Sequence, residues 1–484
     1  MPASVSGLDL VPVRLNTVLR RLQLRPAVRV APNLSVRDSL RAIDADGAEL
    51  AVIVDPRSSM PLGIATLRNA LRAILDGGLD LGESVGGVMT GGVAALSPEA
   101  TVHEAMVHMF RSRVDHLLLN EDDGTFYNIV SQGDLYGMQA VDSQHLANAI
   151  LAAGSVDALA GKAAAVRSYA AHRLTDGASA ESLCEWISAL NDLVTLQVID
   201  LVEGQFELPY VPWCWLVFGS EGRLEQTLIT DQDNGIVFAA DSADEAEALR
   251  RAFLPFAEAV NRALDHCGFS LCTGNIMAGN PAWCLSLDEW KARFAHWIEA
   301  PEPGARLNAT IFFDFRPLYG RYELAGSLRD WLLGRVSGAF LFHAAMAVEA
   351  LQHEPPLGWL RRFRFEDAGH PGTINLKTRG VRLFVDAERI FALMHGCGAT
   401  STTQRLRDAS GPVGIPDEEL GAVIDAFYQI QRLRLRQQLA TGDIDLASRV
   451  HPAQLHELDR QILKEAFAVA GRLQHRLKSV CGQP

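Results

Sequence analysis

The stretch 216–238 constrains the fold of this chain more than any other segment. An apolar run at 215–218 predicts a β-strand, a Gly-Ser pair predicts a turn, and a short polar helical segment precedes a second predicted strand. That second strand carries Asp231 and Asp233. Because side chains of a strand alternate between its faces, the two aspartates point the same way and Gln232 points away. Two neighbouring carboxylates repel each other unless a cation lies between them, so the pair predicts a site for Mg²⁺ and substrate phosphates.

The Gly-Ser turn predicts the phosphate-binding half of such a site. Gly219 lets backbone amides approach a ligand closely, and Ser220 adds a hydroxyl beside them. Arg223 follows one turn later and is expected to contact a phosphate, with Glu225 orienting it. The ligand that best fits this phosphate-binding turn is a triphosphate. The alternative is a strand-turn-strand unit whose two aspartates lie on a solvated edge.

The spacing of these residues resembles the signature of the polymerase-beta-like nucleotidyltransferase superfamily. Within that superfamily it is similar to a bacterial family of nucleotidyltransferase-like proteins linked to CBS domains, relatives of the uridylyltransferases that modify nitrogen-signalling proteins. The residues that carry the resemblance are Gly219, Ser220, Gly222, Arg223, Glu225, Thr230, Asp231, Gln232, Asp233 and Asn234.

The resemblance implies transfer of a nucleoside monophosphate from an NTP to an acceptor, with Mg²⁺ or Mn²⁺ as cofactor. The implied acceptor is a signalling protein, modified on a tyrosine or another hydroxyl. Two alternatives stay open at this point: a nucleotide-sensing interaction protein whose core is inactive, and a nucleotidyltransferase that acts on a small molecule.

Members of the superfamily place a third carboxylate on a later strand. The best candidate here is Asp314, which is embedded in the apolar run 309–320. Metal coordination would compensate its charge, and so would a salt bridge to Arg316. The Gly- and Asn-containing segment 272–283 also resembles the family pattern and predicts a loop beside the nucleotide, with an ordinary turn as the alternative.

Composition limits the classes of function. The chain has 484 residues, 48% of them hydrophobic, which is enough for three or four domains. A net charge of −14 argues against nonspecific nucleic-acid binding, which needs a cationic surface. Seven cysteines occur singly and without zinc-like spacing, which predicts reduced thiols in the cytoplasm. No apolar run has membrane-spanning length and no signal peptide is evident, so we expect no membrane partner.

The first 140 residues contain an internal repeat. The segment 31–40 is echoed by 97–106 at an offset of 66 residues. Each copy predicts a short strand, a helix that begins near Ser35 or Thr101, and then a pair of hydrophobic strands. The expected strand pairs are Leu50–Val54 with Leu62–Ala65 and His116–Leu119 with Asn128–Val130. The repeat resembles a tandem pair of CBS domains, and the resemblance implies a homodimer.

In CBS domains a Ser or Thr and an acid or amide three residues later often hold the ribose of an adenosine ligand. By this resemblance Thr66 with Asn69, and Ser131 with Asp134, would bind an adenine nucleotide. Asn69 departs from the more usual acid, which weakens the first pair. The alternative is that both pairs only cap the helices that follow them.

The predicted fold is a multidomain α+β chain with four parts. These are a tandem CBS module (1–142), a helical connector (143–205), a nucleotidyltransferase core with a mixed sheet (206–321) and a helical substrate-binding domain (322–484). In the last part Lys377 matches a lysine of the family pattern and is the phosphate candidate, with Arg389 and Arg405 as weaker ones. For each, a solvated or ion-paired helix face is the alternative. The alternating Arg-Leu run at 431–436 lies in helical surroundings and does not indicate nucleic-acid binding.

Overall fold

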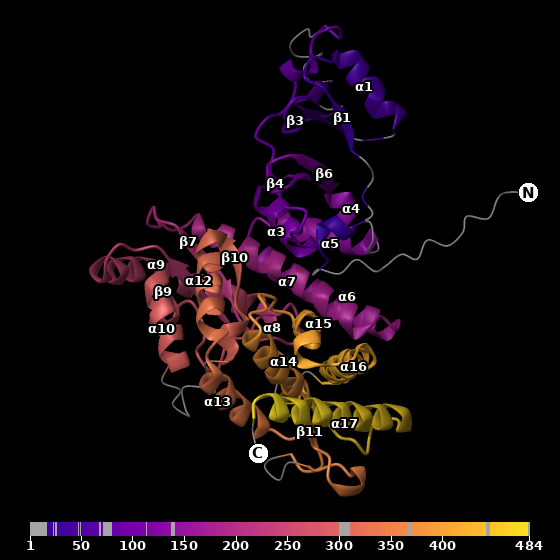
Figure 1. Ribbon diagram of the computed structural model, residues 1–484, viewed down its shortest axis with the longest axis vertical. Coiled ribbons are helices and arrows are strands. Elements are labelled where there is room, and N and C mark those ends of the chain that lie inside the picture. Colours follow the sequence, from indigo (N-terminus) through magenta and orange to yellow (C-terminus); the bar gives the residue numbers. More distant parts are fainter. Residues whose placement is uncertain are drawn as a thin grey trace, which may run out of the picture. The chain divides into compact units, whose positions relative to one another are not determined.

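A computed structural model describes residues 17–482 except 23, 25–26, 47, 49, 67–68, 71–79, 113, 137–140, 300–309, 366–369 and 442–445. The chain divides into two compact units between His145 and Leu146 (Figure 1). This division lies close to the predicted end of the repeat module at 142.

The first unit consists of two copies of one strand-helix-strand-strand motif. The first copy contains β1 (Val28–Val30), α1 (Val36–Ala45), β2 (Leu50–Val54) and β3 (Pro61–Thr66). The second contains β4 (Ala95–Leu96), α3 (Val102–Ser112), β5 (His116–Asn120), β6 (Phe126–Ser131) and the short α4 (Gln132–Tyr136). Both sheets pair their first two strands in parallel and their last two antiparallel. The helices begin at 36 and 102 and the central strands at 50 and 116, which confirms the predicted repeat and its offset.

The predicted helix starts of the repeat are also confirmed. Ser35 Oγ accepts a hydrogen bond from Asp38 N at 3.1 Å, and Thr101 Oγ1 accepts one from Glu104 N at 3.2 Å. Each hydroxyl satisfies a backbone N–H that the first turn of a helix leaves without a partner. Short 3-10 turns at Leu19–Arg21 and Val85–Gly87 complete the described elements of this unit.

The second unit begins with helices that the sequence predicted as a connector. They are α5 (Val141–Leu151), which crosses the division, α6 (Val156–Thr175) and α7 (Ala180–Glu203). Almost every residue of α7 from Leu183 to Ile199 is buried, and α7 contacts α6, α9, α16 and β10. A helix buried all round belongs to the core of its domain. The connector is therefore helical as predicted, and α7 is an integral part of the second unit.

A four-stranded mixed sheet forms the centre of the second unit. Its order is β10 (Arg316–Gly320), β7 (Trp213–Val217), β8 (Asn234–Phe238) and β9 (Cys284–Ser286), and only the β8–β9 pair is parallel. Both faces are covered. Leu216 and Phe218 contribute to a core shared with α10 (Leu287–Glu299) and α12 (Tyr322–Val336), whereas Trp213 and Trp215 pack on Phe256 of α9 (Ala243–His266). Burial on both faces explains why β7 reads as a continuous apolar run.

The C-terminal region is helical, as predicted. Its elements are α13 (Phe340–Leu351), α14 (Arg382–Met394), α15 (Thr402–Val413), α16 (Asp417–Ala440) and α17 (Glu457–Val480), with short strands β11 (Ile374–Asn375) and β12 (Arg449–Val450) and helical turns at Trp359–Arg361 and Lys377–Val381. Two further turns, Pro281–Trp283 and Thr310–Asp314, precede β9 and β10 of the sheet. Phe384, Phe427 and Phe467 of these helices belong to the same hydrophobic core as Phe218 of the sheet. The sheet and the C-terminal helices are thus packed together, which fixes their relative positions.

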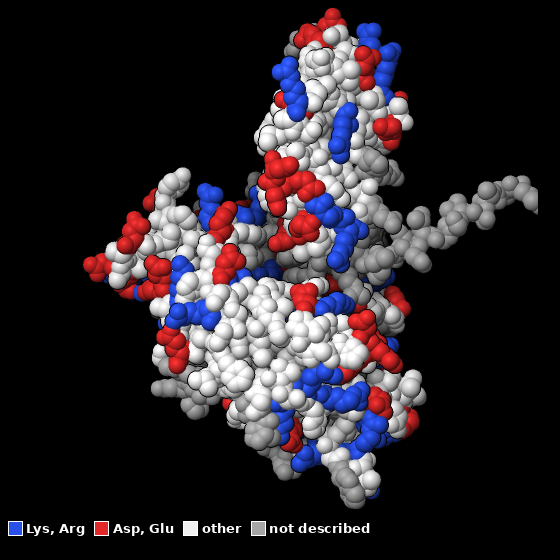
Figure 2. All heavy atoms as spheres, in the orientation of Figure 1, with Lys and Arg blue, Asp and Glu red and all other residues white. Residues whose placement is uncertain are grey.

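Surface charge and helix hydropathy bear on the predictions about nucleic-acid and membrane partners. Acidic and basic side chains are interspersed on the face drawn in Figure 2, without a continuous basic track. Within the described ranges, no single helix is both long and apolar enough to cross a membrane; α12 and α13 meet that test only as a pair, bent by 95°.

Candidate functional site

The two aspartates lie in an extended segment that leads into β8. Asp233 directly precedes the first residue of the strand, Asn234, and Asp231 lies two residues before Asp233. The predicted strand thus starts later than expected. The predicted alternation of side chains is nevertheless present. Gln232 is buried, and its Nε2 donates to the carbonyl oxygens of Asn261 at 2.9 Å and Phe269 at 2.8 Å. Because Gln232 is anchored inward, the side chains on either side of it project toward the opposite face.

The Gly-Ser turn lies directly against Asp233. Phe218 N donates to Asp233 O at 2.9 Å, and α8 (Gly219–Gly222) is the short helical segment predicted after the turn. Gly219 has a φ of 58°, a conformation that favours glycine. A Cβ at this position would lie 3.1 Å from Asp233 Oδ2 and 3.0 Å from Ile311 Cδ1. Backbone and carboxylate therefore meet here only because residue 219 has no side chain.

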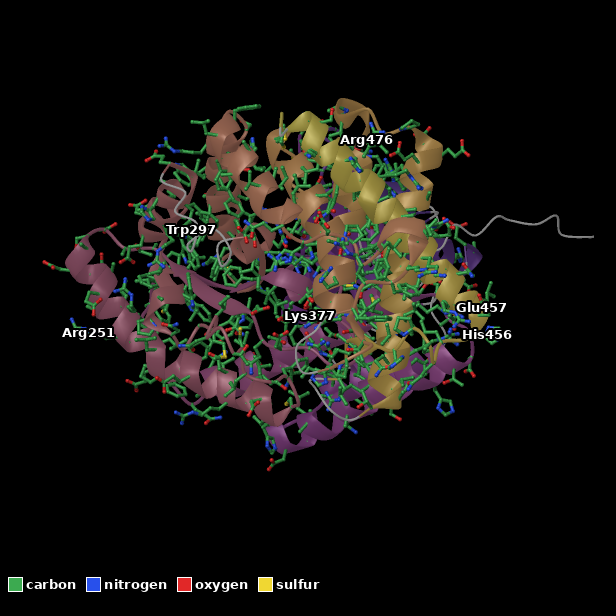
Figure 3. All side chains as sticks on the ribbon, turned by 90° about the horizontal axis from the view of Figure 1, so that it is seen from below. Arg251, Trp297, Lys377, His456, Glu457 and Arg476 are labelled. Carbon is green, nitrogen blue, oxygen red and sulfur yellow. The ribbon has the colours of Figure 1, made fainter. Side chains whose placement is uncertain are left out.

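The electrostatics of the carboxylate pair favour a bound cation. Burial, together with the negative charge of Asp231, raises the pKa of Asp233 to about 7. The thiol of Cys272 hydrogen-bonds Asp233, and Lys377 Nζ lies 3.5 Å from Asp231 Oδ1. Figure 3 shows Lys377 toward the centre of the view from below. The side chain of Asp231 is 35% exposed, so this end of the pair is open to a ligand.

The pair fits a divalent cation that shares its coordination shell with a substrate. Mg²⁺ is commonly held by one or two carboxylates plus phosphate oxygens and water, and a buried carboxylate beside another is a donor set that a cation stabilises. Among the residues that the structure describes, no group of three or more His, Cys, Asp or Glu side chains is arranged to hold a metal. Among the described residues, Asp231 and Asp233 are therefore the carboxylates that would hold the ion.

The structure does not place Asp314 in the predicted role of third metal ligand. It lies at the end of the 3-10 turn Thr310–Asp314, before β10, and is fully buried. Its Oδ1 accepts from Arg389 Nε at 2.9 Å and Arg405 Nη1 at 2.6 Å, and its Oδ2 accepts from Arg389 Nη2 at 2.6 Å and Arg223 Nη1 at 2.5 Å. Burial alone would raise the pKa of Asp314, but the three guanidinium groups outweigh it and hold the pKa well below its usual range.

Asp314 is therefore the centre of a buried ion cluster. The alternative partner expected from the sequence is also wrong, because Arg316 pairs with Asp192 at 2.7 Å instead. The cluster explains the weaker phosphate candidates as well: Arg389 and Arg405 are ion-paired inside the protein.

Arg223 belongs to the same cluster. Its Nε donates to Glu225 at 2.9 Å, which matches the expectation that Glu225 orients it, and its Nη1 donates to Asp314. These contacts do not support the predicted bidentate phosphate contact. Arg223 instead ties the end of α8 to the ion cluster. A Cβ at Gly222 would lie 1.8 Å from the carbonyl oxygen of Asp314, so α8 is pressed against that turn.

The segment 272–283 lies beside the aspartates, and its predicted place beside the nucleotide stays a prediction. Asn234 N donates to Ile276 O at 3.1 Å, and Ala278 N donates to Asn234 Oδ1 at 2.8 Å. Within the loop, Asn275 O accepts from Trp283 Nε1 at 3.0 Å. The segment is thus held by internal hydrogen bonds next to Asp233, and its residue Cys272 contacts the Asp233 carboxylate.

The sequence did not single out two buried charges near the pair. Glu221 lies in α8, and its burial raises the pKa of its carboxyl to about 8, with the charge of Asp192 as the next contribution. Arg434 lies on α16 and is 7% exposed. The Arg-Leu run at 431–436 was noted in the sequence as part of a helix. Its periodicity alone does not reveal which of its arginines is buried.

In the first unit, the two predicted ligand pairs are internally hydrogen-bonded. Asn69 N donates to Thr66 Oγ1 at 3.1 Å, and Asn69 Nδ2 donates to Thr90 Oγ1 at 2.6 Å. Asp134 N donates to Ser131 Oγ at 3.0 Å, and Ser131 Oγ donates to Asp134 Oδ2 at 2.7 Å. Ser131 and Asp134 thus cap α4, as the alternative predicted, whereas the helix expected after Thr66 falls largely outside the described residues. The ligand role of both pairs stays a prediction.

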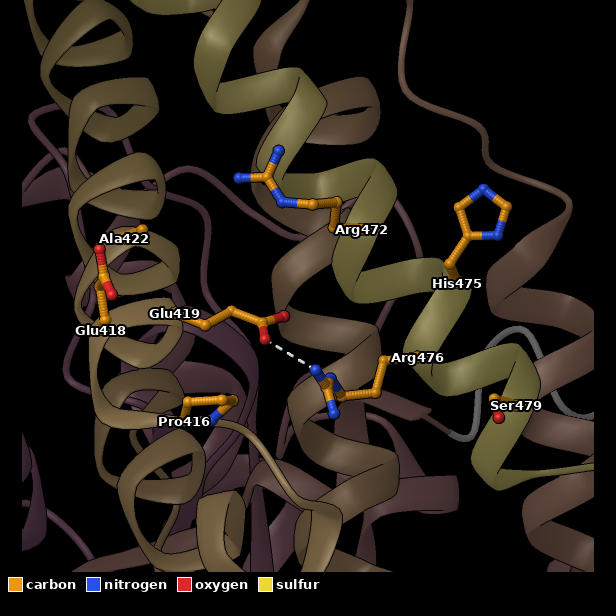
Figure 4. Close-up of a pocket in the computed structure, with 8 residues that line it drawn as sticks. All are labelled: Pro416, Glu418, Glu419, Ala422, Arg472, His475, Arg476 and Ser479. Carbon is orange, nitrogen blue, oxygen red and sulfur yellow. Dashed lines mark hydrogen bonds and ion pairs between the residues drawn. The ribbon is translucent and has the colours of Figure 1, made fainter.

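A separate groove of about 850 Å³ lies between α16 and α17 (Figure 4). Its lining includes Arg472 and His475, and Arg476 pairs with Glu419 across it at 2.7 Å. The groove contains neither Asp231 nor Asp233, so it is distinct from the carboxylate site.

Three family models match the chain. The model described as "Putative nucleotidyltransferase DUF294" matches residues 164–304, and "Putative nucleotidyltransferase substrate binding domain" matches residues 340–481. The CBS domain model matches residues 85–139, the second copy of the repeat. The first match contains β7, β8 and β9 with the two aspartates, and the second contains the helices α13 to α17. No curated protein matches the chain.

Solved structures of CBS proteins resemble part of the chain. A CBS domain protein from Pyrobaculum aerophilum complexed with AMP is 21% identical, covering 25% of this chain and 89% of that one, with a TM-score of 0.23. A CBS-domain containing protein from Agrobacterium tumefaciens is 25% identical and covers 28% of this chain and 98% of that one, with a TM-score of 0.24. A putative signal-transduction protein with CBS domains from Burkholderia ambifaria is 22% identical, covering 27% and 96%, with a TM-score of 0.24. Scores of this size carry no argument about ligands of this chain.

Proposed function

Because this chain belongs to the CBS-domain-linked nucleotidyltransferase-like family, we propose that it transfers a nucleoside monophosphate from an NTP to an acceptor. One observation carries the proposal: the glycine-serine turn lies against the buried carboxylate of Asp233, with Asp231 and Lys377 beside it. A phosphate-binding turn next to paired carboxylates is the arrangement that nucleotidyl transfer needs.

Each group of the site has a distinct task in this proposal. Asp231 and Asp233 hold Mg²⁺ or Mn²⁺, which when bound neutralises charge on the phosphates and polarises the phosphorus–oxygen bonds. Gly219 and Ser220 offer backbone amides and a hydroxyl to the phosphates. Lys377, with its side chain 58% exposed, supplies a mobile positive charge near Asp231. The acceptor hydroxyl releases its proton to solvent and its oxygen forms a bond to the α-phosphorus, while the bond from the α-phosphorus to the oxygen that bridges to the β-phosphate breaks and pyrophosphate leaves.

We propose further that the acceptor is a signalling protein modified on a hydroxyl, and that the first unit regulates the transfer. The CBS match at 85–139 and the hydroxyl of Ser131 at the start of α4 support adenine-nucleotide binding there, with Thr66 and Asn69 as the second half-site. Such a nucleotide controls the catalytic unit if it binds one arrangement of the chain more tightly than another. A homodimer of the CBS module belongs to the same proposal.

The test is incubation with labelled ATP, UTP, CTP and GTP in the presence of Mg²⁺ and a cell extract. We expect label on a protein, and a loss of about 100-fold or more in Asp231→Asn and Asp233→Asn, because each removes a charged ligand of the site. Asp265→Asn, which changes an exposed aspartate of α9, is the matched control and should transfer normally. Undiminished transfer by Asp233→Asn would contradict the proposal. NTP binding without transfer to any acceptor would also contradict it and would favour a sensor.

A further inference from the structure

Helix α16 reaches the segment that leads to the aspartates. Gln438 Nε2 donates to Thr227 Oγ1 at 2.9 Å, and Ile229 N donates to Gln438 Oε1 at 3.3 Å. Arg434 precedes Gln438 by four residues, so both side chains lie on the same face of the helix. That face is directed toward the stretch 227–231, at whose end Asp231 lies.

Arg434 is also connected to the segment that holds Lys377. Its Nε donates to Ser448 Oγ at 3.4 Å, and the carbonyl oxygen of Ser448 accepts from Leu376 N at 2.7 Å. The next residue is Lys377, whose Nζ lies 3.5 Å from Asp231 Oδ1. Asn375 Oδ1 accepts from Lys377 N at 2.9 Å and fixes the backbone there. Arg434 and Lys377 are thus linked through Ser448 and Leu376, and Lys377 lies at the open end of the aspartate pair.

Arg434 differs from the other buried arginines in the described part of the chain. Each of the others pairs with a carboxylate; they are Arg223, Arg316, Arg389 and Arg405. The hydrogen bonds of Arg434 are to neutral acceptors, Gln431 Oε1 at 2.7 Å and Ser448 Oγ at 3.4 Å. Burial lowers the pKa of Arg434 to about 10, although the charges of Asp231 and Glu225 oppose this effect.

A buried cation without an ion-pair partner is unfavourable for folding, and an anionic ligand would compensate it. The guanidinium carries five N–H donors in a planar arrangement that matches phosphate oxygens. In the described part of the chain, the hydrogen bonds to Gln431 and Ser448 use only some of these donors. Arg434 is connected through Ser448 to the backbone next to Lys377, and the charge of Asp231 acts on it, so it is available to phosphates that extend from the carboxylates toward α16.

We propose that Arg434 is a polyphosphate-binding residue: with Lys377 it binds the β- and γ-phosphates of the NTP and then the pyrophosphate that leaves. This inference rests on the proposed function, and it assigns the C-terminal helices a role in binding the nucleotide in addition to any acceptor. Stabilising the pyrophosphate end favours cleavage of the bond between the α- and β-phosphates.

Isothermal titration of the full chain with inorganic tripolyphosphate and Mg²⁺ tests the inference without an acceptor. Arg434→Gln should weaken tripolyphosphate binding by about tenfold or more, and Arg434→Lys by less, because lysine keeps the charge but not the fork. Arg436→Gln is the matched control on the same helix, since Arg436 is exposed and pairs with Asp459 at 2.9 Å. It should bind tripolyphosphate like the wild type.

A thermal melt without ligand separates binding from folding. Arg434→Gln should melt at or above the wild-type temperature, because the substitution removes an uncompensated buried charge. Wild-type affinity for tripolyphosphate in Arg434→Gln would overturn the inference, as would an absence of binding by the wild type. A lower melting temperature in Arg434→Gln, accompanied by equal loss of every ligand, would show a structural role and would also overturn it. Selective loss of tripolyphosphate in a protein that transfers no label would uphold the inference and refute the proposed enzyme.

Discussion

At the scale of single residues, the aspartate pair is held at a cost to stability that a cation removes. Asp233 is 8% exposed and lies beside a second carboxylate, while the nearest cation, Lys377, contacts only Asp231 at 3.5 Å. Like charges in a site of low dielectric destabilise the fold when both are ionised. In the proposed function, this arrangement would serve metal binding at the expense of the free energy of unfolding.

The first prediction concerns the pH dependence of that cost. The pKa of Asp233 rises from 3.8 to about 7 on folding, so the folded state holds the proton more tightly than the unfolded state. The destabilisation caused by ionised Asp233 is absent below the pKa that this residue has in the unfolded state, 3.8. It is complete above the pKa that it has in the folded state, about 7. Asp233→Asn should therefore gain stability relative to the wild type as the pH rises from about 5 to about 8 in EDTA. Thermal melts at the two pH values measure this, and a difference that does not change with pH would contradict it.

The second prediction concerns the turn. Gly219→Ala should destabilise the protein by about 1 kcal/mol or more and weaken NTP binding, because residue 219 has a positive φ and its Cβ would crowd Asp233. Urea unfolding and nucleotide titration measure the two effects. At Gly154 a Cβ would meet no atom within 4 Å, so Gly154→Ala is the control for a glycine replacement. Equal behaviour of the two variants would rule out the special role of the turn.

At the scale of elements, the ion cluster around Asp314 joins three parts of the second unit. Arg223 comes from the end of α8, Arg389 from α14 and Arg405 from α15. The site is thus supported by helices of the C-terminal region that are far from it in sequence. The cluster makes the four-stranded sheet and these helices structurally dependent on each other.

The third prediction separates this supporting role from metal binding. Asp314→Asn should destabilise the protein by about 3–5 kcal/mol, because three buried guanidinium groups lose their shared counter-ion. The fraction that remains folded should still bind Mg²⁺ with NTP. Denaturant unfolding combined with metal titration provides the measurement. Normal stability together with lost metal binding would restore Asp314 as a ligand.

Local features of the site could be predicted from the sequence, whereas its long-range partners could not. The turn at Gly219, the short helix and the alternation around Gln232 depend on neighbouring residues, and all three are present. The role of Asp314 depends on Arg389 and Arg405, which are 75 and 91 positions away. An acid in an apolar run shows only that some partner exists. The inward orientation of Arg434 likewise follows from how α16 packs, which its own periodicity does not determine.

At the scale of the whole molecule, the chain combines a repeat unit and a unit that contains the nucleotidyltransferase-like sheet. The repeat was predictable because each copy has its own cap and strand pair, and the offset of the helices and central strands survives in the structure. The sequence predicted three separate parts within residues 143–484, whereas the structure has residues 146–484 as one compact unit. One hydrophobic core runs from Phe218 of the sheet to Phe467 of α17, so packing joins what composition suggested were separate parts.

The fourth prediction tests the proposed sensor in the full chain. Ser131→Ala should weaken AMP binding by about tenfold or more, because the hydroxyl at the head of α4 would contact the ribose. Thr101→Ala removes an equivalent cap at α3, where Thr101 Oγ1 accepts from Glu104 N at 3.2 Å, and should leave AMP binding unchanged. Titration calorimetry compares the two. Equal losses in both variants would mean that Ser131 acts only as a cap.

The most direct test of the central claim is a titration of Mn²⁺, followed by electron paramagnetic resonance, in the presence of a non-hydrolysable NTP analogue. The wild type should bind Mn²⁺ together with the analogue, and the Asp231→Asn/Asp233→Asn double variant should bind it about tenfold or more weakly. Asp265→Asn should match the wild type. Equal binding of Mn²⁺ by the wild type and the double variant would contradict the claim that these two aspartates hold the metal.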